Sequence, residues 1–367
     1  MVPRLDVRHA RCMTRTTNLG AAHEIADAVR SGRITAAEIT RAQLAKIDQL
    51  DGALGAFRSV RHAAALAEAE AIDAHANRSE LPLAGVPVAV KDNIAVAGEQ
   101  VRHGSEATSS DPAVSDDELV VRLRRAGAIV IGISRMPELA AWAFTSSTAF
   151  GVTRNPWNPL LDPGGSTGGG AVAVASGMAA LTLGTDGGGS LRVPSAYCGV
   201  VGVKPGRHEV PLPEGLNEHW CGLSVAGPIA RTAADAALAL AVLRDQRPTA
   251  LEVASTPLRI AVSRRSPVPT SRADAHQWAA LEHTVTRLQA LGHEVVDADP
   301  PYPPTLIQRW SRRWWAGIAL DAERLATQPD RLEKRTRTMI AKGRRVLRFG
   351  GPRPAVAARW RETQASG

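Results

Sequence analysis

The uneven distribution of glycine is the feature that most constrains the fold of this chain. Of its 32 glycines, 13 lie between positions 164 and 206, although an even spread over 367 residues would place about four there. Glycine has no Cβ, so it adopts positive φ angles and lets the backbone approach another group closely. The stretch therefore predicts tight loops that lie against a ligand or against another segment of the chain.

Two serines are carried by these loops. Ser166 lies in the glycine loop 164–170, and Ser190 lies 24 positions later, at the end of a second glycine loop, 185–190. Between the loops, a run of small apolar residues predicts a buried helix and a short strand. Hydroxyl groups held on tight loops favour nucleophilic chemistry, but the residue types leave more than one interpretation open.

Phosphate binding and a Ser-His-Asp hydrolase are two interpretations of the loops. A phosphate loop needs Lys followed by Ser or Thr at the start of the helix, and neither loop has that lysine. Ser166 fits the G-x-S-x-G nucleophile elbow, but the proline-containing loop 158–163 stands where the strand of the elbow would be. In such a hydrolase the base would be a downstream histidine: His208, His219, His276, His283 or His293.

A third interpretation uses Lys91 as the base. The run 83–90 is apolar and of strand character, and Lys91 follows it directly. Burial penalises the ammonium form of a lysine, so a lysine at the end of a buried strand can accept a proton near neutral pH. The structural alternative is a lysine whose amine reaches solvent or pairs with Asp92.

Helix and strand signals alternate along the chain. Thr35 with Glu38 forms a capping box that predicts a helix to about Leu50, and a second helix is predicted over 61–75. These helices precede the strand signal at 83–90.

Two further segments combine a helix with a strand. Ser115 with Glu118 predicts a helix start, Gly127 ends that helix, and the apolar run 128–133 predicts a buried strand. The same order of helix, glycine and extended segment recurs over 278–296. Buried strands that alternate with helices are typical of an α/β protein whose sheet is covered on both faces.

The C-terminal part of the chain is responsible for the net charge of +8. Residues 301–367 hold 15 Lys/Arg and 5 Asp/Glu, whereas residues 1–300 hold 29 and 31. Arginines interleaved with tryptophans (Trp310, Trp314, Trp315 and Trp360) can bind nucleic-acid phosphates. Because arginines on the solvent face of amphipathic helices give the same count, nucleic acid is not the favoured partner.

Cysteine usage and hydropathy predict a cytoplasmic protein. Cys12, Cys198 and Cys221 are too scattered for a disulfide framework or a four-cysteine zinc site, and small apolar neighbours predict a packing role for Cys198. No apolar run reaches the ~18 residues of a membrane span. Residues 1–17 are predicted to be an irregular, arginine-rich leader in which Met13 is an alternative start, and the sequence leaves open whether a homo-oligomer forms.

Five segments make the chain resemble the amidase signature family over about residues 14–345. They are GVPVAVKDN (85–93), FGVTRNPWN (150–158), PGGSTGGG (163–170), LGTDGGGSLRVPSAYCGVVGVKP (183–205) and GLSVAGPIART (222–232). The resemblance implies an α/β amidase signature fold with a mixed central sheet covered by helices on both faces. It also implies hydrolysis of a small-molecule carboxamide to a carboxylate and ammonia or an amine, without a metal or cofactor.

The catalytic residues of the family match positions in these segments. The resemblance implies that Ser190 is the nucleophile, that Ser166, preceded by a cis peptide, is the bridging serine, and that Lys91 is the terminal base. Backbone N–H groups ahead of the nucleophile would form the oxyanion hole. These groups fall at Gly187, Gly188, Gly189 and Ser190, with Thr185 beside them in the substrate site and with Asp186 and Arg192 as a charge pair that braces the loop.

The chain departs from the family pattern at several positions. Gly187 stands where the family usually has a larger residue. Trp142 and Phe144 fall where the family lines its substrate entrance, and both also fit a role in the core. After Arg345 the resemblance fades, whereas members of the family usually continue.

These limits predict the domain organisation and an alternative function. An amidase signature domain is predicted over 18–345, with its catalytic core at 80–232, followed by a divergent basic tail at 346–367. If the chain is a truncated product, the alternative is a catalytically silent protein with the amidase fold.

Overall fold

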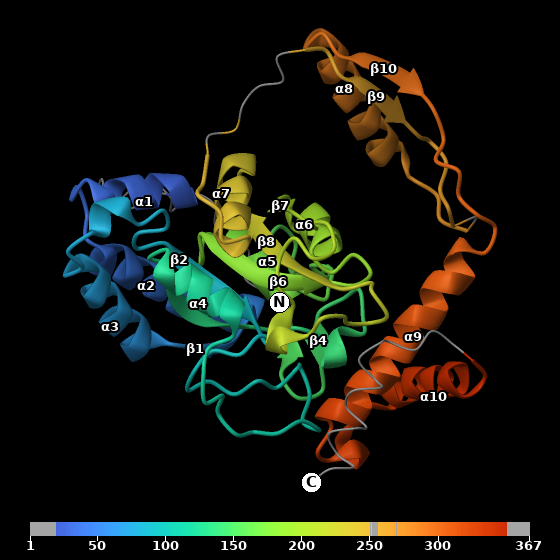
Figure 1. The fold of residues 1–367 in the computed structure, drawn as a ribbon, viewed down its shortest axis with the longest axis horizontal. Helices are drawn as coiled ribbons and strands as arrows, with labels where there is room; N and C mark the ends of the chain where they lie inside the picture. The colour runs from blue at the N-terminus through green and yellow to red at the C-terminus, as the bar shows by residue number, and fades with distance from the viewer. Residues whose placement is uncertain (1–19, 250, 252–255, 269, 351–367) are drawn as a thin grey trace. The chain divides into compact units, whose positions relative to one another are not determined.

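The computed structural model describes residues 20–249, 251, 256–268 and 270–350 (Figure 1). The predicted leader and the part of the predicted tail after residue 350 lie outside these residues. The chain divides into two compact units, one made of the residues up to 249 and from 314 onward, the other of residues 250–313. This division falls within the segment 18–345, for which the sequence predicts one amidase signature domain.

A mixed sheet of six strands forms the centre of the first unit. Its strand order is β1-β3-β2-β6-β8-β7. Strand β2 runs parallel to both β3 and β6, and the other neighbours are antiparallel. The mixed α/β class predicted from the sequence is confirmed. The bounds are β1 (Phe57–Val60), β2 (Pro87–Lys91), β3 (Ile129–Ser134), β6 (Leu181–Asp186), β7 (Val201–Gly202) and β8 (Val225–Ala230); β4 (Ser146–Ser147) pairs separately with β5 (Gly151–Val152).

Helices cover this sheet in Figure 1. Strands β2, β3, β6 and β8 are buried at every position, and successive side chains of a strand point to opposite faces, so both faces are covered. Helix α5 packs against β2, β6 and β8, and α7 packs against β6, β7 and β8. The helices are α1 (Ala22–Arg30), α2 (Ala36–Leu54), α3 (His62–Asp73), α4 (Glu118–Arg125), α5 (Gly168–Ala175), α6 (Arg192–Cys198), α7 (Ala233–Leu243), α9 (Leu306–Leu325, in this unit from Trp314) and α10 (Lys334–Arg348).

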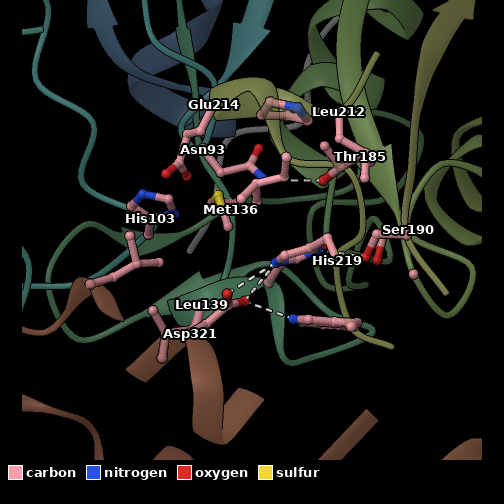
Figure 2. A pocket seen from close by; sticks show the side chains of 18 of the residues that line it. Asn93, His103, Met136, Leu139, Thr185, Ser190, Leu212, Glu214, His219 and Asp321 are labelled. Carbon is pink, nitrogen blue, oxygen red and sulfur yellow. Dashed lines mark hydrogen bonds and ion pairs between the residues drawn. The ribbon is translucent and has the colours of Figure 1, made fainter. Parts of the chain in front are cut away.

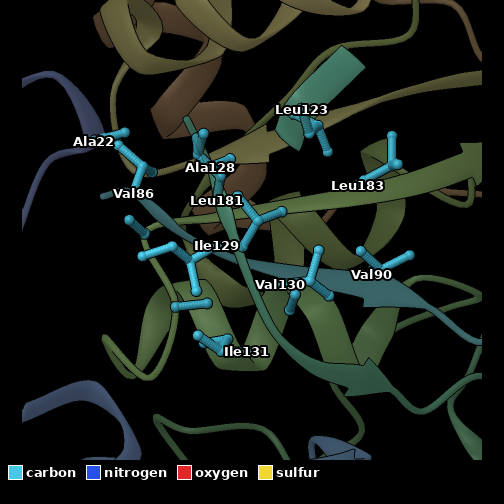
Figure 3. Close-up of a cluster of buried hydrophobic side chains, with 14 of the residues drawn as sticks. Ala22, Val86, Val90, Leu123, Ala128, Ile129, Val130, Ile131, Leu181 and Leu183 are labelled. Atoms are coloured by element: carbon cyan, nitrogen blue, oxygen red, sulfur yellow. The ribbon is translucent and has the colours of Figure 1, made fainter. Parts of the chain in front are cut away.

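Aliphatic side chains of the central strands form the hydrophobic core (Figure 3). Val90 of β2, Ile131 of β3 and Leu183 of β6 are at most 1% exposed. Each such side chain contributes about 1.5–3 kcal/mol when it is buried. The core therefore fixes the register of the parallel strands, and this register positions the side chains at their carboxyl ends.

The start and end signals of the helices are mostly confirmed. The Thr35 hydroxyl accepts from the N–H of Glu38, and α2 continues past Leu50 to Leu54, before Gly55 at φ 62°. The predicted start of α4 at Ser115 is wrong. The cap is Asp117, whose carboxylate accepts from the N–H of Leu119 at 3.0 Å, because the chain enters the helix only after that residue.

The second unit is a small α/β segment. Helix α8 (Ala275–Ala290) connects the parallel strands β9 (Arg259–Val262) and β10 (Glu294–Asp297). The helix and the extended segment predicted over 278–296 are confirmed. Among the helices of the described residues, none is long and apolar enough to cross a membrane.

Two helical glycines make opposite predictions for the same substitution. A Cβ at Gly169 in α5 would lie 2.4 Å from the Ala56 carbonyl oxygen, whereas a Cβ at Gly52 in α2 would meet nothing within 4 Å. Gly169→Ala should therefore lower the free energy of unfolding by about 1–3 kcal/mol. Gly52→Ala should raise it by about 0.5–1 kcal/mol, since alanine is the better helix former. Urea denaturation of both variants measures the difference, and stabilisation by both substitutions would contradict the close packing at Gly169.

Candidate active site

The buried amine of Lys91 lies at the carboxyl end of β2. Its Nζ donates to Ser166 Oγ at 2.9 Å and to Thr185 Oγ1 at 2.9 Å. Burial lowers the pKa of Lys91 to about 7, although the negative charge of Asp186 acts in the opposite direction. Near neutral pH a substantial fraction of this amine is therefore uncharged and able to accept a proton.

Asp92, the next residue, does not pair with this amine. Its carboxylate accepts from Arg58 Nε at 2.8 Å and from the backbone N–H groups of Arg102 and Gly104 at 3.1 and 3.0 Å. The structural alternative for Lys91, an amine at the surface or paired with Asp92, is thus wrong. Asp92 instead holds the loop that carries His103, a residue in the left-handed region at φ 48°.

The two glycine loops contact each other next to Lys91. The Gly165–Ser166 peptide bond is cis, as the resemblance implies. The N–H of Thr167 donates to the carbonyl of Ser190 at 3.1 Å, which joins the loops directly. A Cβ at Gly165 would lie 2.7 Å from the carbonyl oxygen of Phe144, so only glycine allows this close approach.

Asp186 organises the loop that ends at Ser190. Its carboxylate accepts from the N–H groups of Gly189 and Leu191 at 2.7 and 3.1 Å, and from Nε and Nη2 of Arg192 at 3.0 Å. Burial favours the neutral acid, but the contacts with Arg192 and the two N–H groups outweigh it and hold the pKa of Asp186 below its ordinary value. The predicted charge pair is therefore present, with backbone contacts.

The prediction that Gly189 is an oxyanion donor is wrong. The N–H of Gly189 is directed to Asp186 and is not available to a substrate. In the described part of the chain, no hydrogen bond is formed by the N–H groups of Gly187, Gly188 and Ser190. Three of the four predicted donors thus remain candidates.

Thr185 and Asn93 complete the surroundings of the amine. Thr185 Oγ1 accepts from Asn93 Nδ2 at 3.1 Å as well as from Lys91. Its carbonyl oxygen lies 3.4 Å from the lysine Nζ. Thr185 was predicted in the substrate site; it lines the pocket, but its side chain bonds the lysine.

A single pocket brings the two serines together (Figure 2). Ser166, Thr185, Gly187 and Ser190 line it, together with apolar side chains such as Met136. Within the described residues, no hydrogen bond joins the two serine hydroxyls. Five titratable residues outside the predicted lysine relay also line this pocket: His103, Glu214, His219, Asp321 and Arg324.

The histidines contradict the nucleophile-elbow interpretation of Ser166. Of the five candidate bases, only His219 lines the pocket, and its Nδ1 lies 2.7 Å from Ser224 Oγ. The hydroxyl of Ser166 bonds Lys91 instead. His219 was therefore found among the candidates for a different role, and Asp321, its partner 102 positions away in α9, has no sequence signal that links it to the site.

Trp142 and Phe144 pack against each other outside the pocket. Their ring centroids are 5.6 Å apart, and the guanidinium of Arg335 lies over both rings. Neither ring lines the pocket; Trp142 is half-buried against the hydrophobic cluster that contains Trp220 and Ile318, which favours the core alternative for this residue. The small residue at Gly187 has a different cause, because a Cβ there would lie 2.6 Å from the Trp220 ring.

Cys198 has the predicted packing role. It is fully buried, and burial raises the pKa of its thiol to about 12, with a further contribution from Asp162. The described residues contain no group of three or more His, Cys, Asp or Glu side chains that could hold a metal ion.

The fold and the site define an α/β protein in which a buried lysine bonds a serine that follows a cis peptide. The amidase family pattern matches residues 38–348. The relative named "Putative amidase AmiB2" from Mycobacterium tuberculosis is 45% identical over 320 residues, which are 85% of this chain and 69% of the relative. This chain belongs to the amidase signature family.

Solved structures share the fold. 6-Aminohexanoate cyclic dimer hydrolase superposes with a TM-score of 0.79 at 29% identity, and the match covers 88% of this chain and 71% of the hydrolase chain. A bacterial aryl acylamidase of the amidase signature family superposes with a TM-score of 0.76 at 26% identity and covers 88% and 71%. The amidase signature fold predicted from the sequence is confirmed.

The Asp186–Arg192 pair predicts unequal costs for its two partners. Asp186 is fully buried, whereas the Arg192 side chain is 54% exposed. Asp186→Ala leaves two buried N–H groups without an acceptor and should lower the free energy of unfolding by about 2–4 kcal/mol. Arg192→Ala removes an exposed charge and should cost about 1 kcal/mol or less. Urea denaturation tests the order, and a larger loss in Arg192→Ala would contradict a loop held mainly by Asp186.

Proposed function

We propose that this protein hydrolyses a small-molecule carboxamide through an acyl-enzyme on Ser190, with Ser166 and Lys91 as the proton relay. The family supports amide hydrolysis in general. The observation that carries the finer proposal is the buried Lys91 amine, which is 2.9 Å from Ser166 Oγ and has a pKa of about 7. A serine hydroxyl needs such a base before it is an effective nucleophile.

The proposed acylation moves one proton along the relay. Ser190 Oγ attacks the substrate carbonyl carbon while its proton passes to Ser166, and the proton of Ser166 passes to neutral Lys91. This step requires the Ser190 hydroxyl to donate to Ser166 Oγ, and both serines line the same pocket. The same relay then returns a proton to the leaving nitrogen, and the C–N bond breaks to leave an ester on Ser190. Water attacks that ester by the same route and releases the carboxylic acid.

Charges around the relay support its two protonation states. Burial favours the neutral amine of Lys91 before the reaction, and the ionised Asp186 stabilises the ammonium that forms during it. The N–H groups of Gly187, Gly188 and Ser190 would receive the negative charge on the carbonyl oxygen. One such donor is typically worth ~3 kcal/mol in the transition state.

A catalytically silent protein is the second candidate. The observation in its favour is that the hydroxyls of Ser166 and Ser190 do not bond each other among the described residues. Covalent labelling of Ser190 by a fluorophosphonate probe separates the two candidate functions.

A fluorophosphonate probe should label Ser190 in the wild-type protein. Lys91→Ala should slow labelling by about 10²-fold or more, because the general base is lost. Lys334→Ala, which removes an exposed lysine on α10, is the matched control and should label at the wild-type rate. Peptide mass spectrometry locates the label. A folded wild-type protein without label would favour the silent protein, and label on Ser166 would overturn the assignment of the nucleophile.

The labelling rate should depend on pH in a defined direction. Lys91 accepts a proton only in its neutral form, so the rate should rise about tenfold per pH unit below the pKa of about 7 and level off above it. Stopped time courses between roughly pH 5.5 and 8.5 measure this profile. A rate that stays constant over this range, or that falls as pH rises, would contradict a lysine base.

A further inference from the structure

A hydrogen-bonded chain of Asp321, His219 and Ser224 lies in the wall of the pocket. We propose that Ser224 accepts a hydrogen bond from the N–H of the scissile carboxamide, and that Asp321 and His219 position its hydroxyl for this role. The inference rests on the proposed function and deepens it, because it assigns a residue that distinguishes amides from esters.

The first step of the argument concerns Asp321. Its carboxylate accepts from His219 Nε2 at 3.0 Å and from the indole Nε1 of Trp220 at 2.7 Å (Figure 2). Arg324 pairs with it as well. Three N–H donors thus face one carboxylate, so Asp321 is the acceptor in each contact, and the proton of the contact with His219 belongs to Nε2.

The second step concerns the proton of Ser224. When the neutral imidazole carries its proton on Nε2, its Nδ1 is an acceptor. Ser224 Oγ lies 2.7 Å from that Nδ1, so in this tautomer the serine donates its proton to His219. The lone pairs of the serine oxygen then remain, and Ser224 can offer a substrate only an acceptor.

The third step concerns the location of this acceptor. Ser224 is 7% exposed and lines the same pocket as Ser190. A Cβ built on Gly187 would lie 3.0 Å from Ser224 Oγ, so the hydroxyl lies beside the first glycine of the loop 185–190. A substrate carbonyl at the N–H groups of this loop would place its amide nitrogen within the same pocket.

The chemistry of amides and esters differs at this contact. An amide nitrogen that carries hydrogen donates to the Ser224 oxygen, whereas the ester oxygen has no hydrogen and presents lone pairs to it. A site built to bond an N–H discriminates against the analogue that lacks it, because the buried polar group is then left unpaired. The chain Asp321–His219–Ser224 therefore favours amides that retain an N–H.

The test compares 4-nitroacetanilide with 4-nitrophenyl acetate, which share acyl and aryl groups and differ in the N–H. Ser224→Ala should lower kcat/KM for the amide by about 10- to 100-fold and change that for the ester by less than about threefold. Asp321→Asn should shift the amide-to-ester ratio in the same direction, because His219 can then carry its proton on Nδ1. Ser176→Ala, which removes a hydroxyl that bonds only within α5 and its end, is the control and should change neither rate.

The outcomes separate this inference from the proposed function. Fluorophosphonate labelling of Ser190 in Ser224→Ala shows that the variant is folded and that its nucleophile works. With labelling retained, equal losses for amide and ester, or no loss for either, would overturn the role of Ser224 alone. Label on Ser224 would also overturn it, since the serine would then be a nucleophile. If the wild-type protein neither labels nor hydrolyses the amide, the proposed function fails and this inference fails with it.

Discussion

The site is organised around the amine of Lys91, which is buried at the end of a central strand. A buried amine that lacked partners would be costly, so three acceptor oxygens surround it, from Ser166 and from the side chain and carbonyl of Thr185. Strands β2 and β6 are parallel and paired in register from Val88 with Leu181 to Val90 with Leu183. This register places the end of β2 beside Thr185, while the glycine loop brings Ser166 from a third segment.

Buried carboxylates hold the loops around this amine. Asp186 accepts two backbone N–H groups of the Ser190 loop, Asp92 accepts two from the loop that carries His103, and Asp321 anchors the segment of His219 and Trp220. Loops lack the regular backbone hydrogen bonds of strands and helices, so their buried N–H groups need such acceptors. The same carboxylates decide which donors remain for a substrate: Asp186 takes the N–H of Gly189 and leaves that of Ser190.

The sequence predicted the elements that depend on local chemistry. These elements follow from residue types within a short window of sequence. They are the capping box at Thr35, the buried strands before Lys91 and after Gly127, and the glycine loops, and the structure contains all of them. The start of α4 was missed because Ser115 and Asp117 both offer a capping oxygen, and the path of the chain selects between them. Gly189 was missed as an Asp186 partner because a donor's direction depends on φ and ψ.

The sequence alone thus determined the α/β class, the two serine loops and a lysine suited to a base, because glycine, apolar periodicity and a strand-end lysine have local physical meaning. Only the tertiary structure decided which groups meet. In the tertiary structure Ser166 bonds Lys91, and His219 bonds Ser224 and Asp321. The ring of Trp220 lies against Gly187. These contacts join residues far apart in the chain, and they arise from strand register and helix packing, which no short window of sequence records.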